Sequence, residues 1–306
     1  MVRRQRVAHG IRVKESLGGR IYSAFNYVFV TLIALLMLYP MLNVLAVSLS
    51  EYSEYLKAPW MVFPRNVTLD GYKFVFNYSG FWRSYAITIL VTALGTALGL
   101  IITILTSYPL SRPQFKGKTI IMLMIIFIMV FSAGLVPSYL NMKELGLVNN
   151  LFAIIIPSCF TPFNCILMIN FMKEIPGDLI DAAMVDGASE PYILFKIIVP
   201  LSRAVMASIT LFLAVGYWNS YFSAQVYLRD RELWPLALVL KELLLEASTL
   251  MAEAGMDPAV LDAFDNLQTV TIRYASIIVS VVPILCVYPF LQKYFAKGVM
   301  VGGVKG

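Results

Sequence analysis

Long apolar segments alternate with short polar ones along nearly the whole 306-residue chain. Six of them are long enough to cross a bilayer, which takes about 20 residues. They span approximately residues 21–49, 86–110, 120–140, 151–172, 204–228 and 275–295. Backbone groups in lipid must be hydrogen-bonded within the protein, so we expect each segment to be helical. The pattern predicts an all-α membrane protein with six transmembrane helices.

The composition supports a membrane protein. The chain is 59% hydrophobic and 14% charged, whereas a soluble domain has about 25% charged residues. The first segment follows a basic stretch but is too long for the core of a cleaved signal peptide. We therefore interpret it as a first membrane span.

The distribution of charge predicts the orientation of the spans. If the N-terminus is inside, the inner segments carry 15 of the 24 basic residues and the outer segments carry 9. A basic excess marks the cytoplasmic side, so we expect both termini to be cytoplasmic. The predicted parts are a basic tail (1–20), a six-span domain (21–296) with a cytoplasmic loop (174–202) and an external loop (229–270), and a cytoplasmic tail (297–306). This layout explains the net charge of +6 without a nucleic-acid partner.

The loop between spans four and five has a more specific pattern than a simple connector. Pro176 and Gly177 break the preceding helix, and Asp178 is expected to cap a new short one. Helical spacing then places small apolar residues on one face, suited to a groove in a partner protein. They are Ile180, Ala183, Met184 and Ala188.

This loop resembles the EAA loop of ATP-binding-cassette (ABC) importer permeases. The matching positions are Asp181-Ala182-Ala183, then Gly187, Ile197, Val199 and Pro200, with Asp for Glu and Val for Leu as the two departures. The resemblance implies a coupling helix that docks on a cytoplasmic ATPase. The implied coupling residues are Asp181, Ala182, Ala183, Met184, Asp186, Gly187 and Pro200. The alternative is a membrane-surface helix whose spacing is accidental.

Three further stretches resemble the sugar-importer branch of the same family. They are the turn Tyr108–Lys118, the external turn Leu145–Asn150 and the glycine-rich tail. Together they identify the chain as a type I ABC importer permease of the maltose-type carbohydrate family, oligosaccharide branch.

The chain is not expected to bind ATP itself. A phosphate loop that used Gly117-Lys118-Thr119 would need a glycine five residues before Gly117, where Arg112 stands. We therefore expect a transport subunit without catalysis or cofactor of its own, with ATP and Mg bound by partner ATPases.

The resemblance implies a definite assembly in the bacterial cytoplasmic membrane. The expected partners are a second homologous permease, two cytoplasmic ATPase subunits, an extracytoplasmic solute-binding protein, an oligosaccharide substrate and membrane lipid. A permease for a non-sugar solute is the alternative. A secondary transporter is less favoured, because such carriers usually have intramembrane carboxylates and none of the six spans contains Asp or Glu.

The sugar path is expected in the outer half of span five. Trp218, Asn219 and Tyr221 combine aromatic faces, which stack on sugars, with an amide that bonds hydroxyls. An aromatic belt with one inter-helix hydrogen bond explains them equally well. Pro157 and Pro162 predict a bent fourth span near a cavity, or a purely structural kink.

Close helix packing is expected around span two. Gly95 and Gly99, with Ala93 and Ala97, place small residues at four-residue spacing along this helix. Such a face lets a neighbouring helix approach closely.

Overall fold

The computed structural model describes residues 17–243, 270–287 and 289. Most of the predicted N-terminal tail and external loop, the end of the sixth span and the C-terminal tail lie outside the described residues. Within them the regular secondary structure is helical, and only an isolated bridge joins Ser50 to Val67. The all-α prediction is confirmed for this part of the chain.

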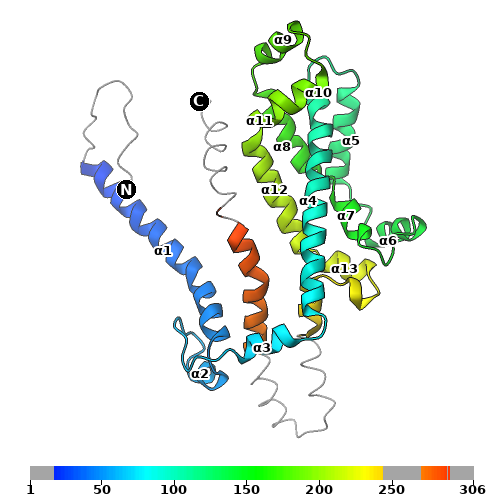
Figure 1. Ribbon diagram of the computed structural model, residues 1–306. Coiled ribbons are helices and arrows are strands. Elements are labelled where there is room, and N and C mark those ends of the chain that lie inside the picture. The colour runs from blue at the N-terminus through cyan, green and yellow to red at the C-terminus, as the bar shows by residue number, and fades with distance from the viewer. Residues whose placement is uncertain (1–16, 244–269, 288, 290–306) are drawn as a thin grey trace.

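Three continuous helices are long and apolar enough to span a membrane (Figure 1). They are α1 (Leu17–Ser48), α4 (Phe81–Ser111) and the helix Val270–Val287, orange in the figure. Each lies within or overlaps a predicted span.

Three bent helix pairs are further candidate spans by length and composition. They consist of α5 (Lys118–Val130) with α6 (Leu135–Glu144), bent by 117°; α7 (Phe152–Ser158) with α8 (Pro162–Lys173), bent by 44°; and residues Glu190–Leu201 with α12 (Arg203–Trp218), bent by 81°. Counting each pair as one span gives six, as the sequence predicts.

Two predicted spans are wrong as continuous helices. Segment 120–140 breaks at residues 131–134, where Gly134 has a positive φ of 83° that favours glycine. Segment 204–228 breaks at Asn219, and a separate helix α13 (Tyr221–Tyr227) follows. Hydrophobicity alone did not reveal either break, because the residues on both sides are apolar.

Shorter elements gather at the two ends of the bundle. One end carries α9 (Gly177–Val185), followed by α10 (Glu190–Ile193), the π-helical turn Leu194–Ile198 and α11 (Val199–Leu201). The opposite end carries α2 (Tyr52–Lys57) and α3 (Asp70–Asn77) (Figure 1). A 3₁₀ turn (Arg231–Leu233) and a helix at 236–243 follow α13.

The predicted turn at 145–150 is confirmed, and Asn149 fixes it. This residue has a positive φ of 66°, and its Oδ1 accepts hydrogen bonds from the backbone N–H groups of Arg229 and Asp230 at 3.0 and 2.9 Å. Its own N–H donates to the carbonyl of Tyr227 at 2.8 Å. The turn is therefore attached to the chain that follows α13.

The centre of the bundle is the packing of α4 along α8 and α12. A Cβ added to Gly95 would lie 2.5 Å from the ring of Tyr217 on α12, and one on Gly99 would lie 3.1 Å from Leu213. The two glycines thus allow the close approach that the small-residue spacing predicts.

Helix α1 stands apart from this bundle (Figure 1). Its membrane-spanning window has no buried residue, and apolar side chains are exposed along most of its length. Among its described side chains, only those of the last turn, Ala46, Val47 and Ser48, are buried. The rest of this apolar surface needs lipid or another membrane chain to cover it.

We expect Gly95→Ala to destabilise the protein by about 1–3 kcal/mol, the usual cost of overpacking a core. The Tyr217 ring is 2% exposed and its hydroxyl is hydrogen-bonded, so it cannot easily move away. Gly216→Ala is the matched control, because a Cβ there meets no atom within 4 Å. The melting temperature of the detergent-solubilised protein should be lower for Gly95→Ala and unchanged for Gly216→Ala. Equal melting temperatures would contradict the packing argument.

Candidate functional site

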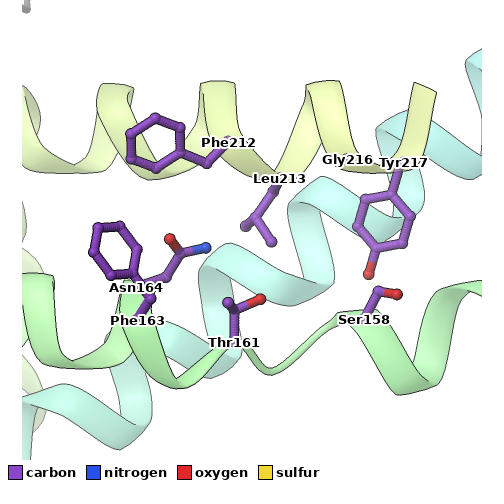
Figure 2. Close-up of a pocket in the computed structure, with 8 residues that line it drawn as sticks. All are labelled: Ser158, Thr161, Phe163, Asn164, Phe212, Leu213, Gly216 and Tyr217. Atoms are coloured by element: carbon purple, nitrogen blue, oxygen red, sulfur yellow. The ribbon is translucent and has the colours of Figure 1, made fainter. Parts of the chain in front are cut away.

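A hollow of about 310 Å³ lies where the α7–α8 span is broken, opposite α12 (Figure 2). Several of its lining side chains are exposed, so it opens on the surface of the chain. The lining residues are Ser158, Thr161, Phe163, Asn164, Phe212, Leu213, Gly216 and Tyr217.

Two prolines create the break. Helix α7 ends just after Pro157, and Pro162 begins α8 at a position where its missing N–H is no loss. The Tyr217 hydroxyl donates to the carbonyl of Ile155 at 2.8 Å and so satisfies a group near the end of α7. The predicted bend is confirmed by the 44° angle between α7 and α8, and the hollow lies beside it.

Asn164 is the polar group that most clearly indicates a ligand. Its side chain lies on α8, is 2% exposed and extends toward α12 (Figure 2). Its Oδ1 has no hydrogen-bond partner among the described residues. A buried amide oxygen without a partner costs about 1–3 kcal/mol. Because Asn164 lines the hollow, a small rotation of its side chain would let this oxygen accept a hydrogen bond from a molecule there.

The other lining residues combine aromatic and hydroxyl groups. Phe163 and Phe212 are exposed with ring centroids 6.2 Å apart, and Ser158 and Thr161 carry hydroxyls. None of the described lining residues is charged. The hollow is therefore suited to a molecule that has both apolar faces and hydrogen-bonding groups.

The structure does not bring Trp218 into this hollow. Its indole N–H donates to the carbonyl of Ser280 at 3.0 Å, and its ring packs edge-on against Tyr85 at 6.0 Å. It lines a separate, mainly apolar groove of about 310 Å³ between α4, α12 and the helix Val270–Val287.

Asn219 and Tyr221 also lie elsewhere. Asn219 is exposed at the end of α12, and its amide donates to Val215 of the same helix at 3.1 Å. Tyr221 is exposed on α13, with the Lys241 ammonium 5.2 Å from its ring centroid. The substrate role of these two residues and of Trp218 stays a prediction.

Sequence reasoning identified the stretch Gly216–Tyr221 but missed the residues on the facing α7–α8 segment. Asn164 is one amide in an apolar run, and its burial without a partner depends on the packing of α12. The available signal was the pair Pro157 and Pro162.

A second candidate site is the short helix α9, which lies apart at one end of the molecule (Figure 1). It begins at Gly177 with Pro176 as its N-cap, so the expected cap at Asp178 is wrong. Because the helix begins at Gly177, Asp178 falls in its first turn, where a carboxylate interacts favourably with the helix dipole.

Gly187 terminates α9 in a Schellman motif. Its φ is +83°, its N–H donates to Met184, and the Ala188 N–H donates to Ala183. Glycine adopts this left-handed conformation without the Cβ penalty. The fixed glycine of the loop pattern therefore has a backbone role within the chain.

The expected docking face of α9 needs a correction. Ile180 is 5% exposed and belongs to the core of this chain, and Ala183 and Ala188 pack against that core. Ile180 and Ala183 share the face of α9 that packs on this core, and the Schellman motif returns Ala188 to the same side. The free surface is formed by Leu179, Asp181, Ala182, Met184, Val185, Asp186 and Gly187. Pro200 lies separately, in α11.

A family profile described as "Binding-protein-dependent transport system inner membrane component" matches residues 111–301. The chain belongs to this family. The matched region contains both the hollow and α9.

Relatives of this permease match it over nearly their full lengths. Protein LplC of Bacillus subtilis (strain 168) is 38% identical over 293 residues, which cover 94% of this chain and 96% of LplC. The polygalacturonan/rhamnogalacturonan transport system permease protein YtcP of the same strain is 35% identical over 287 residues, which cover 94% and 99%.

A solved structure also resembles the permease. It is a chain in the crystal structure of a bacterial ABC transporter involved in the import of the acidic polysaccharide alginate, with a TM-score of 0.77 and 34% identity. The match covers 92% of this chain and 98% of the other. The protein is thus the membrane-spanning permease subunit of an ABC importer in the bacterial plasma membrane.

Proposed function

We propose that this permease imports a carbohydrate, most simply an oligosaccharide, and that the hollow at Asn164 forms part of its path. The observation that carries the proposal is the buried, unpartnered amide oxygen beside exposed aromatic rings. Aromatic faces stack on the apolar faces of sugars, and amides and hydroxyls bond sugar hydroxyls. The names of YtcP and of the alginate transporter are consistent with this substrate class.

A second, homologous permease would complete the path. The hollow opens on the surface of this chain, so these residues form one wall. Helix α1 also presents an uncovered apolar surface that suits another membrane chain. Both features support a heterodimer of permeases surrounded by lipid.

ATP hydrolysis belongs, in this proposal, to two separate cytoplasmic subunits, one of which docks on α9 of this chain and the other on the second permease. The free surface of α9 carries Asp181, Ala182 and Met184, together with apolar groups such as Val185, which is 87% exposed. Arg112 stands where a phosphate loop around Gly117 would need glycine, which argues against ATP binding by this chain.

Transport then follows alternating access. A solute-binding protein, which the family description implies, would deliver the sugar at the end opposite α9. ATP binds one state of the assembly better than the other and shifts the population toward it. Closure of the ATPases would move α9. The movement would pass along the chain to α12 and so change the shape of the hollow.

We expect Asn164→Leu to weaken sugar uptake without destabilising the protein. Replacing an amide whose Oδ1 has no partner by an apolar group of similar size removes a buried polar cost. The lost hydrogen bond to the sugar should raise the half-saturation concentration about two- to tenfold, which corresponds to ~0.5–1.5 kcal/mol. Uptake kinetics at matched membrane expression and thermal unfolding measure the two effects.

Asn219→Leu is the matched control for Asn164→Leu, with Trp218→Ala as a further comparison. Unchanged uptake in Asn164→Leu would overturn the proposed path. A loss of uptake in Asn219→Leu and Trp218→Ala alone would place the sugar near the end of α12 instead. A lower melting temperature in Asn164→Leu would indicate a structural amide.

The coupling role of α9 predicts a graded response at Gly187. Asn tolerates positive φ better than other side chains, whereas β-branched Val does not. We expect Gly187→Asn to keep most uptake, and Gly187→Val to lose it because the end of α9 is displaced. Uptake and ATP hydrolysis at matched membrane levels provide the readout, and normal uptake in Gly187→Val would contradict the coupling role.

The orientation is testable by labelling single cysteines. In a background without the three native cysteines, Ser189→Cys should react with an impermeant reagent only from the cytoplasm. Ser248→Cys, in the predicted external loop, should react only from outside. The reverse pattern in intact cells would overturn the topology that the basic residues predict.

A further inference from the structure

A three-residue polar contact joins α4 to the segment that follows α9. Arg112 caps the end of α4, and its Nη2 lies 3.7 Å from Oε1 of Glu190 in the first turn of α10. The Tyr108 hydroxyl donates to Oε2 of the same carboxylate. The Arg112 guanidinium also lies 5.7 Å from the centroid of the Tyr108 ring. We call this contact the polar joint.

The polar joint crosses a space that is otherwise open. A hollow of about 560 Å³ lies between the turn after α4 and α9, and Pro109, Gln114, Phe115 and Met184 line it with the three joint residues. Of the nine residues of α9, only Ile180 is buried. Apolar packing therefore holds α9 to the bundle mainly through Ile180, which belongs to the same core as Tyr108, and the polar joint adds a second contact beside the hollow.

The α4 side of the polar joint is largely buried, whereas the Glu190 side is exposed. Tyr108 is buried, the Arg112 side chain is 15% exposed, and the Lys118 ammonium donates to the Arg112 carbonyl at 3.3 Å. The Glu190 side chain is 58% exposed. A pair this accessible adds little to global stability, so its place between α4 and the segment that follows α9 explains it better than a stabilising role.

The covalent route from α9 to the bundle is indirect. It passes through α10, the π-helical turn Leu194–Ile198 and an 81° bend before α12 begins. The polar joint instead connects Glu190 directly to α4, which packs along both α8 and α12. These two helices carry Asn164 and Tyr217, which line the hollow.

We propose that Arg112 and Glu190 are positioning residues that transmit the displacement of α9 to α4. The inference rests on the proposed coupling role of α9. In this inference the Tyr108–Lys118 turn keeps α9 and the helix bundle in a fixed relative position during transport. When the joint is lost, α9 still binds the ATPase, but its movement reaches the hollow through the apolar contacts of Ile180 and the bent route, without the direct polar link to α4.

The test uses the complete transporter, purified with its ATPases and reconstituted with its binding protein. Glu190→Gln removes one charge and keeps the length of the side chain, and Arg112→Met removes the guanidinium but keeps most of the apolar stem. We expect each to lower the ratio of substrate-stimulated to basal ATP hydrolysis about two- to fivefold, the range of one exposed ion pair. Basal hydrolysis, co-purification of the ATPases and melting temperature should stay unchanged, which a purely structural role does not predict.

The double variant shows whether the residues act through one contact. If they do, Arg112→Met combined with Glu190→Gln is no worse than either single change. The matched control is Lys73→Met with Asp70→Asn, an exposed pair 3.0 Å apart at the opposite end. If Arg112→Met accumulates poorly, Tyr108→Phe replaces it, because this change removes only the hydroxyl bonded to Glu190.

The outcomes separate the joint from the coupling role itself. Unchanged ratios in Glu190→Gln and Tyr108→Phe, or additive effects in the double variant, overturn the joint. Gly187→Val in the same assay tests the coupling role of α9. A normal ratio in Gly187→Val refutes the coupling role, whereas a reduced ratio there with normal joint variants refutes the joint alone.

Discussion

The contact between Gly95 and Tyr217 determines how the rest of the bundle fits together. Without a side chain at position 95, the Tyr217 ring lies against α4, and its hydroxyl reaches the Ile155 carbonyl near the end of α7. One aromatic residue thus joins three helices and satisfies a backbone group that a broken helix would otherwise leave unpaired in a membrane. The same ring forms a wall of the hollow.

Membrane spans tolerate such breaks only where neighbouring groups satisfy the exposed backbone or where a cavity is formed. The α7–α8 break meets both conditions, because Tyr217 bonds one carbonyl and Asn164 lies buried beside the hollow. The site is therefore a product of the break. A straight fourth span would leave no space between α8 and α12 at this level.

The sequence predicted most of the fold because the apolar segments and the loop pattern are strong signals. It did not predict the break at 131–134, since a helix interrupted within apolar residues has the same hydrophobicity as a straight one. The position of Gly187 was predicted from the spacing of the loop, but its reason, a left-handed backbone, appears only in the structure. Asn164 was missed because its burial depends on α12, which is distant in the sequence.

Helix α1 has a consequence for the bilayer around the protein. Its 32 residues span about 48 Å at 1.5 Å per residue, whereas the hydrocarbon core is about 30 Å thick. Such a helix fits only by tilting or by extending its first turns, which include Arg20, into the headgroup region. Figure 1 shows α1 inclined to α4. A change in membrane thickness would therefore be met by the tilt of α1 or by the depth of its first turns in the headgroup region, and the lipid composition becomes part of what sets the position of this helix.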